Sequence, residues 1–181
     1  MNQEKKTKKS DLLFLVLITI LAVAVRLAVR TFVAEDWSVY WSDWLARLSE
    51  GGFRALADDF YDYAPPVMYI LYFITLLPVN AMTAFKGLCC LLDFAGAALI
   101  GRMVTECSGS RKRGYLAYGV FLFLPTVILN AAVWSQCDII YTLLILASVY
   151  YLMNNRTWMG MWFYGAAFAV KLQTLFIFPL S

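Results

Sequence analysis

The chain has 181 residues, of which 62% are hydrophobic and 15% charged, with a formal net charge of +3. A soluble domain of this length could not bury that much apolar surface, so the composition predicts an integral membrane protein. There is no histidine, which excludes a histidine general base and a histidine-bound zinc site. The four cysteines have neither metal-ligand spacing nor a disulfide framework. Acid–base chemistry must therefore rest on carboxylates, Lys, Tyr or Cys.

The hydrophobic residues fall into six segments, where a spanning helix needs roughly 20 apolar residues. The segments are Leu12–Val33, Pro66–Val79 (short), Ala84–Val104, Tyr115–Val133, Ile139–Met153 and Trp158–Leu180. No small-residue cleavage site comes after the first one, so it is interpreted as a retained anchor and not as a signal peptide. The predicted fold is all-α: a polytopic transmembrane bundle of about six hydrophobic helices.

These segments divide the chain into four parts. The parts are a basic tail over 1–11, a first transmembrane helix over 12–34, an outer loop over 35–64, and the remaining transmembrane helices over 65–181. The tail contains lysines, which by the positive-inside tendency place the N-terminus in the cytoplasm: Lys5, Lys6, Lys8 and Lys9. Residues 35–62 contain seven carboxylates and two arginines, a net charge of −5. This segment is expected outside, on a multi-pass protein of the plasma (inner) membrane.

The basic loop Arg111–Arg113 marks a second cytoplasmic segment, which would put Trp134–Asp138 outside and Asn154–Arg156 inside. This assignment creates one conflict. Two full crossings between residues 64 and 104 would leave the basic loop on the outer face. Either Pro66–Val79 does not cross completely, or this loop departs from the rule.

The outer loop contains an apolar stripe at helical spacing. Its members are Trp37, Tyr40, Trp41, Trp44, Leu45 and Leu48. The pattern predicts an amphipathic helix lying in the membrane interface, with its rings at headgroup depth. Gly51–Gly52 is expected to end it, because glycine tolerates the left-handed conformation after a helix. The plainer alternative is a connector helix in which Asp36 is only the N-cap.

A few ionisable residues lie inside apolar stretches, where charges are costly and face a cavity or one another. They are Arg26, Arg30, Lys86, Asp93, Asp138 and Lys171. Arg26 and Arg30 could snorkel to headgroups or hold a phosphate. Lys171 could neutralise a phosphate or pair with Asp93 or Asp138.

Several motifs occur in an order that resembles a known family. They are Asp36 followed by Trp41 and Trp44; Gly51-Gly52-Phe53; Tyr63-Ala64-Pro65-Pro66; Trp134-Ser135-Gln136-Cys137-Asp138; and Lys171-Leu172-Gln173 before Pro179-Leu180. The pattern resembles the GPI-mannosyltransferase-related membrane proteins of the GT-C glycosyltransferase superfamily. Relatives commonly have Gly where this chain has Ser135, and Pro where it has Leu172. They are also much longer, so the chain resembles the N-terminal part of such an enzyme.

The resemblance implies transfer of a sugar from a polyprenyl-phosphate-linked donor to a hydroxyl of a lipid or glycan acceptor at the outer membrane face. It makes Asp36 the expected general base. Asp43 is the second candidate: seven residues further on, it would face the same way on a regular helix. A surface pair between Asp43 and Arg47 is the plainer reading.

The other matched residues are expected to bind substrate. Gln136 and Asp138 could bind sugar hydroxyls or help a divalent cation, or Asp138 could simply satisfy a helix N-terminus. Lys171 and Gln173 would face the donor phosphate, with Tyr63 at the entry to the next helix. No cofactor is certain, membrane lipids are expected partners, and nucleic acid is not.

Two other classes compete with an enzyme. In a transporter or channel module, the buried charges would line a solute pathway. In a non-catalytic membrane subunit, the outer loop would recruit a partner. The acidic residues cluster in one loop and not at mid-membrane, and no pair of Gly/Pro-broken helices stands out, which weighs against transport.

Overall fold

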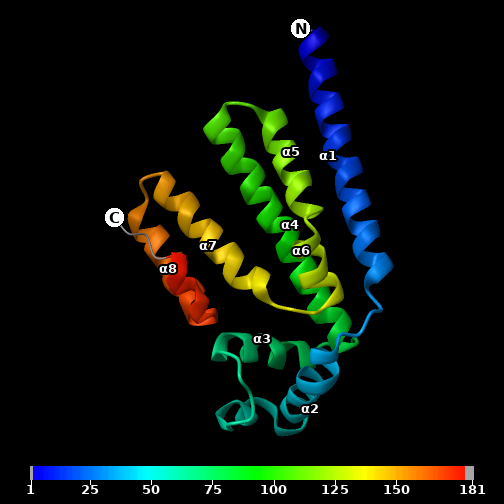
Figure 1. Cartoon of the computed structure of the whole chain (residues 1–181), viewed down its shortest axis with the longest axis vertical. Helices are drawn as coiled ribbons and strands as arrows, with labels where there is room; N and C mark the ends of the chain where they lie inside the picture. Colours follow the sequence, from blue (N-terminus) through cyan, green and yellow to red (C-terminus); the bar gives the residue numbers. More distant parts are fainter. Residues whose placement is uncertain (1, 178–181) are drawn as a thin grey trace.

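The computed structural model describes residues 2–177, and over this range all regular structure is helical, as predicted (Figure 1). The elements are α1 (Asn2–Val29), the π-helical turn η1 (Trp37–Trp41), α2 (Ser42–Gly51), the 3-10 helix η2 (Gly52–Ala57), α3 (Pro65–Thr75), α4 (Ala81–Ser108), α5 (Arg111–Leu122), α6 (Pro125–Ile128), the π-helical turn η3 (Leu129–Val133), α7 (Asp138–Met153), α8 (Thr157–Val170) and the 3-10 helix η4 (Leu172–Ile177). The predicted Pro179-Leu180 motif lies outside the described residues.

Two helices in the described range are long and apolar enough to cross a membrane, Ser10–Val29 within α1 and Ala81–Ser108. A third candidate is the pair Arg111–Leu122 and Pro125–Val133, which is bent by 52°. Pro125 explains the bend, because proline lacks an N–H and its ring clashes with the preceding turn. By length and composition, residues 2–177 therefore contain two, or up to three, of the roughly six expected spans.

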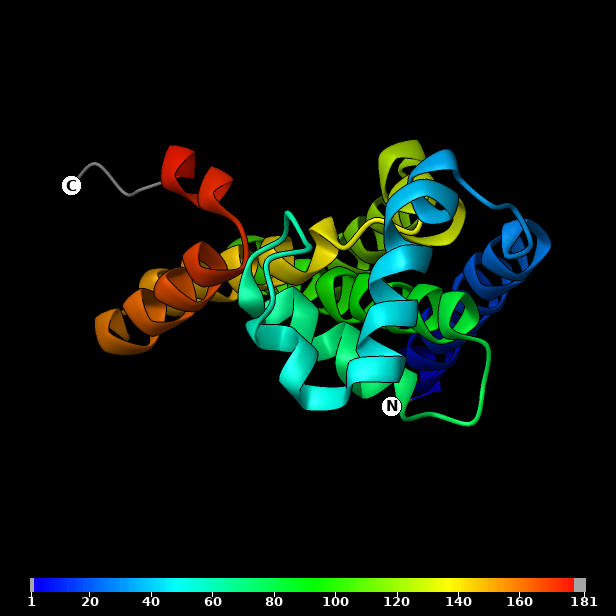
Figure 2. The ribbon, with the colours of Figure 1, turned by 90° about the horizontal axis from the view of Figure 1, so that it is seen from below.

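The segment predicted as Pro66–Val79 does not run along the bundle. Its helix α3 has 11 residues, about 16 Å at 1.5 Å per residue, which is half of a bilayer core of about 30 Å. In Figure 1 it lies across one end of the molecule, and Figure 2 shows it with α2 in front of the lengthwise helices. The loop between α4 and α5 consequently lies at the same end as the start of α1. Incomplete crossing, one of the two explanations for the topology conflict, thus agrees with the structure.

Several predicted boundaries are wrong. Helix α1 begins at Asn2, so the basic tail is helical and continuous with the first apolar segment, and it ends at Val29 instead of Val33. The last apolar segment is broken at Lys171, which has extended backbone angles (φ −153°, ψ 125°) between α8 and η4. A residue that precedes proline prefers such angles. In this chain the next residue is Leu172, so the helix breaks here without a proline.

Small residues bring the lengthwise helices together. A Cβ added to Gly114 of α5 would clash with Thr105 Oγ1 and lie 2.5 Å from the carbonyl oxygen of Gly101, both on α4. Across the α7–α8 pair, the Ser148 hydroxyl donates to the Gly160 carbonyl at 2.8 Å. Close approach through small residues, helped by a hydroxyl, is typical of helices that associate in lipid.

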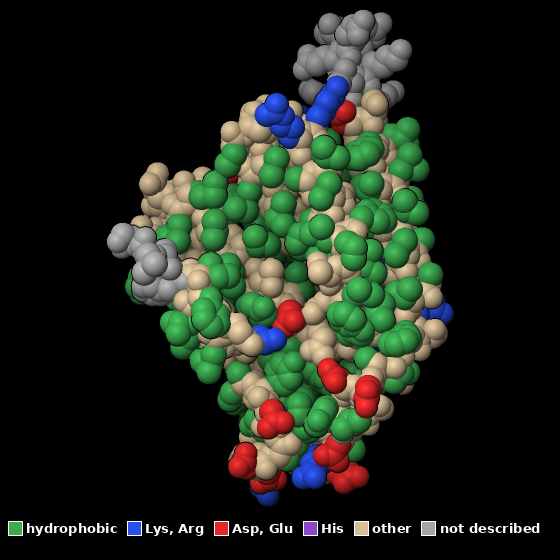
Figure 3. Space-filling view, in the orientation of Figure 1, with side chains coloured by type: hydrophobic (Ala, Val, Ile, Leu, Met, Phe, Trp, Pro, Cys, Tyr) green, Lys and Arg blue, Asp and Glu red, His purple; other side chains and the backbone are tan. Residues whose placement is uncertain are grey.

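The helix in the loop 35–64 forms where predicted, and α2 ends at Gly51, before Gly52 with φ +61°. Its three tryptophan side chains pack inward against the rest of the protein. Trp37, Trp41 and Trp44 are 8%, 2% and 5% exposed. Trp41 packs on Phe85 of α4, with ring centroids 4.9 Å apart. The rings therefore anchor this end of the molecule to the bundle, while acidic side chains gather on its outside (Figure 3).

Candidate functional site

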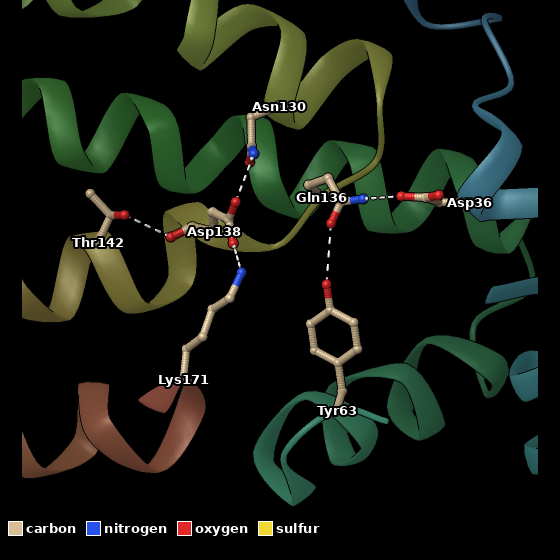
Figure 4. Close-up of polar contacts among 7 residues, drawn as sticks. All are labelled: Asp36, Tyr63, Asn130, Gln136, Asp138, Thr142 and Lys171. Carbon is tan, nitrogen blue, oxygen red and sulfur yellow. Dashed lines mark hydrogen bonds and ion pairs between the residues drawn. The ribbon is translucent and has the colours of Figure 1, made fainter. Parts of the chain in front are cut away.

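Three predicted residues from separate parts of the chain meet at the end of the molecule beside α2 and α3 (Figure 4). The Gln136 side-chain amide donates to Asp36 Oδ2 at 2.9 Å. The Tyr63 hydroxyl donates to Gln136 Oε1 at 3.2 Å. Each bond uses the correct end of the amide, so Tyr63 sets the orientation in which Gln136 presents its N–H to the carboxylate.

Tyr63 is held as a donor by its surroundings. It is half-buried, and its ring packs 5.1 Å from that of Trp41. Burial raises the pKa of the hydroxyl above its usual value near 10, and the negative charge of Asp138, with that of Cys137 once its thiol ionises, adds to that shift. The phenol therefore stays protonated throughout the neutral range and keeps donating to Gln136.

A second polar group lies two residues further along the chain, at the start of α7. Lys171 Nζ donates to Asp138 Oδ1 and forms an ion pair with it. Asn130 Nδ2 donates to the other carboxylate oxygen of Asp138 at 3.0 Å. The Lys171 ammonium also lies 5.4 Å from the centre of the Tyr141 ring. Of the two partners proposed for Lys171, the structure selects Asp138.

The backbone between these two groups is fixed by an unusual turn. Ser135 has φ +57°, in the left-handed region that non-glycine residues rarely adopt. Its side chain is fully buried, and its hydroxyl has no hydrogen-bond partner among the described residues. The turn lets the Gln136 N–H donate to the Asn130 carbonyl at 2.9 Å. Glycine at this position in the resembling family is the residue that this geometry favours.

The backbone on both sides of Asp36 is held by two neighbouring residues of α4. Lys86 is buried, and its ammonium donates to the carbonyls of Arg30 at 3.2 Å and Phe32 at 2.5 Å, just past the end of α1. Phe85 packs on the rings that come after Asp36. A cation at a helix C-terminus is favourable because the last carbonyls lack partners. The connection leading into Asp36 is therefore fixed.

The plainer reading of Asp36 as an N-cap is wrong. Its backbone is already helical, and its side chain makes no capping hydrogen bond. The exposed carboxylate instead reaches Gln136. Asp36 is directly followed by η1, and Asn130 lies within η3. Single π-helical turns are rare and frequently occur at functional sites.

Asp43, the second candidate base, does not join this group. It pairs with Arg47 at 3.0 Å, and both side chains are more than half exposed. The turn η1 lies between Asp36 and Asp43 and contains an extra residue. One extra residue rotates the next part of the helix by about 100° around the axis, so the expectation that the two carboxylates face the same way is wrong. The plainer surface pair is present in the structure.

Arg26 and Arg30 lie apart from these residues. The Arg26 guanidinium donates to Asp93 Oδ2 at 3.0 Å and to the carbonyls of Ala22 and Leu122 at 3.3 and 3.2 Å. It is 4% exposed, and four of its five N–H groups donate within the protein, so it does not snorkel and is poorly placed to hold a phosphate. Arg30 is exposed beyond the last turn of α1 and borders a small cavity of about 170 Å³.

A cavity of about 730 Å³ opens beside the second polar group, between residues 61–64 and residues 170–176. Tyr63, Lys171 and Gln173 line it together with Asp62. The rest of the lining is largely apolar, including Leu172, Leu175 and Phe176. Its volume lies within the usual range for ligand pockets, about 300–1,000 Å³. It suits a ligand with an apolar part and a polar or anionic end.

Sequence reasoning assigned no role to Asn130 and did not foresee how Lys86 would act. Asn130 lies in an apolar run, where an isolated amide is an available signal because it needs a partner when buried. For Lys86, nothing in the neighbouring sequence indicates that its ammonium binds the carbonyls at the end of α1. The described residues contain no group of three or more His, Cys, Asp or Glu side chains that could hold a metal ion.

No protein-family model, no curated protein and no solved structure matches the chain. The geometry of the polar residues at this end of the molecule is therefore the basis for assigning a function.

Proposed function

We propose that the chain belongs to a GT-C type membrane glycosyltransferase of the mannosyltransferase-like kind. It transfers a sugar from a polyprenyl-phosphate-linked donor to a hydroxyl of a lipid or glycan acceptor. The observation that carries the proposal is the meeting of Asp36, Gln136 and Tyr63, which come from three distant segments, beside an ion-paired lysine that lines a cavity.

Asp36 is the general base in this proposal. Only its Oδ2 accepts a hydrogen bond from the described residues, so Oδ1 is free to take the proton from the acceptor hydroxyl. Gln136 fixes the carboxylate, and Tyr63 fixes Gln136. This support holds the base in one orientation, which matters because proton transfer requires hydrogen-bond distance to the reacting hydroxyl.

Lys171 receives the departing lipid phosphate. Its ammonium has three N–H groups, of which Asp138 takes one. Because its side chain is 24% exposed and borders the 730 Å³ cavity, a phosphate in the cavity can reach the remaining donors. Gln173 offers a further amide at the same opening. A divalent cation beside Asp138 is compatible with this arrangement but not required by it.

The orientation in the membrane belongs to the same proposal. With α3 lying across the end, the lengthwise elements are α1, α4, the bent α5–α6 unit, α7 and α8, giving a multi-pass chain. The N-terminus and Arg111–Arg113 are then cytoplasmic, and Asp36 faces outward across the plasma (inner) membrane. Residues 35–51 contact the outer interface with their exposed face.

A transporter has less support. Three charges that would line a pathway are already occupied: Arg26 and Asp93 by each other, and Lys86 by backbone carbonyls. Buried groups that make most of their hydrogen bonds within the protein stabilise helix contacts and leave little for a passing solute.

The direct test compares Asp36→Asn with Asp43→Asn in the complete gene product, in membranes supplied with radiolabelled polyprenyl-phosphate mannose. Loss of a general base lowers transfer by about 10²- to 10⁴-fold, whereas Asp43→Asn should stay within about twofold of wild type. Undiminished transfer by Asp36→Asn would refute the role of the base. Absence of transfer by the wild-type protein with any polyprenyl-phosphate sugar would favour the non-catalytic subunit.

A further inference from the structure

A second cavity lies at the opposite end of the bundle, near the loop between α4 and α5, and has no role in the proposed transfer. Its volume is about 440 Å³, and α1, α4 and α5 all contribute to its lining. This volume is in the range of ligand pockets. The cavity shares no lining residue with the one beside Lys171.

The polar part of the lining is basic. Its lining contains two arginines, Arg102 of α4 and Arg111 of α5, and one carboxylate, that of Glu106. Arg102 uses its Nε to reach Glu106 at 2.8 Å, which leaves its two terminal nitrogens as donors. Lys112 and Arg113 come directly after Arg111 on the surface. The net positive charge favours an anionic group, and guanidinium groups bind phosphate oxygens well.

Part of the remaining wall is apolar. Leu15 of α1 and Ala98 of α4 are exposed or partly exposed along it, and Gly101 contributes no side chain. In the same lining, the hydroxyls of Thr19 and Tyr118 are hydrogen-bonded to each other at 2.9 Å, joining α1 to α5. A ligand that satisfies both parts has an anionic end at the arginines and an apolar chain along the helices.

The position along α4 places the arginines at headgroup depth. The helix has 28 residues, about 42 Å at 1.5 Å per residue, whereas the hydrocarbon core is about 30 Å thick. Its last turns, which contain Arg102 and Glu106, therefore extend into the polar layer of the membrane. Basic pockets between membrane helices at this depth bind anionic lipid headgroups.

We propose that this cavity binds an anionic glycerophospholipid, with the phosphate against Arg111 and Arg102 and an acyl chain along Leu15 and Ala98. The contact joins α1 to the α4–α5 pair, and a bound lipid would stabilise that joint by mass action.

The test is native mass spectrometry of the complete protein in detergent micelles titrated with phosphatidylglycerol or phosphatidylcholine. The variants are Arg111→Gln, Ala98→Phe, which fills the apolar wall at an exposed position, and the charge-matched control Arg156→Gln, an exposed residue outside the cavity lining. We expect wild type and Arg156→Gln to retain phosphatidylglycerol. Arg111→Gln should bind it about tenfold more weakly than the control, the effect of losing one hydrogen bond to a charged group.

Each other result overturns the proposal. Equal retention of phosphatidylcholine would mean that the phosphate end is not selected by charge. Equal weakening by Arg156→Gln and Arg111→Gln would mean general electrostatic attraction. Retention unchanged by Ala98→Phe would exclude the apolar wall. Displacement of the lipid by millimolar inorganic phosphate would identify a site for a free anion. None of these outcomes depends on sugar transfer.

Discussion

Among the described residues, two ion pairs between a basic side chain and an aspartate link different helical segments, and they differ in how many donors remain unused. Arg26 and Asp93 are 4% and 2% exposed as side chains, and the guanidinium also binds two backbone carbonyls. Lys171 and Asp138 are 24% and 33% exposed, and the ammonium borders a cavity. The first pair uses its donors within the protein, whereas the second keeps some for a ligand.

The difference teaches how to sort buried charges in a membrane bundle. An intramembrane charge suggests function by default, and all six charges in the apolar stretches qualified on that basis. Counting the donors left after the protein contacts separates a helix fastening from a binding group. By that measure Arg26 belongs with the packing, and Lys171 belongs with the site.

The largest expected effect comes from breaking the buried ion pair between Arg26 and Asp93. Arg26→Met leaves Asp93 buried and unpaired, which should cost about 3–5 kcal/mol of unfolding free energy. Unfolding in mixed micelles, followed by tryptophan fluorescence, measures it. The double variant Arg26→Met/Asp93→Leu should recover most of the loss, since it leaves no uncompensated charge. If Arg26→Met lowered the free energy of unfolding by less than about 1 kcal/mol, the pair would not stabilise the packing of the helices.

The pKa of the Cys137 thiol reports on how far water is excluded beside the ion pair between Lys171 and Asp138. Burial raises the pKa of its thiol from near 9 to about 11, with the charge of Asp138 adding to the effect. As the pH rises, the thiol ionises in the unfolded chain before it ionises in the folded chain. The protonated thiol therefore contributes fully to the stability of the fold below pH 9, and this contribution is lost as the pH rises to 11. We expect a loss of up to roughly 2–3 kcal/mol across that window, and Cys137→Ala should remove it. The control Cys107→Ala, at an exposed cysteine, should keep it; equal slopes would contradict the assignment.

Breaking the ion pair between Lys171 and Asp138 should lower the free energy of unfolding much less. Lys171→Met leaves Asp138 with Asn130 and with access to water, so the expected loss is about 1 kcal/mol, near the upper end for accessible pairs. The same micelle unfolding assay gives the value beside that of Arg26→Met. If the two losses were equal, the contrast between the pairs would disappear.

The smallest effect has the opposite sign. Ser135→Gly relieves a left-handed backbone and removes a buried hydroxyl without a partner among the described residues, and should stabilise the fold by about 0.5–1 kcal/mol. Asn155 also has positive φ, at 56°, but asparagine tolerates this region. Asn155→Gly should therefore change the melting temperature little. A lower melting temperature for Ser135→Gly would mean that the Ser135 hydroxyl stabilises the turn that leads to Gln136 and Asp138.

Local rules explain much of the structure that could be predicted from the sequence. The helical class comes from long apolar segments, and the end of α2 comes from Gly51–Gly52. The break at Pro125 was available to the same rules, but the apolar run across it made one helix look continuous. The break at Lys171 has no such marker, because its extended backbone comes after an uninterrupted apolar stretch.

Pairings across the chain were the hardest to foresee. Asp36, Gln136 and Lys171 were each identified as candidates, but which carboxylate takes which partner depends on how the helices pack. The turn η1 illustrates the limit: it rotates Asp43 away from Asp36, and no residue in it indicates a π-helical turn. The tryptophans were placed in the membrane interface because a stripe of rings has the same spacing whether it contacts lipid or Phe85.

The bond between Asp36 and Gln136 joins residues 100 positions apart, and this separation has a consequence for the order of folding. Contacts between neighbours in sequence, such as those of α4 with α5 and α7 with α8, close short loops and form early. The bond to Asp36 closes a loop that contains all of α2 to η3, so we expect it to form after the α4–α5 hairpin inside that loop. A chain stalled part-way through folding would have its helices but not this site, and intact contact between Asp36 and Gln136 is thus a marker of a finished fold.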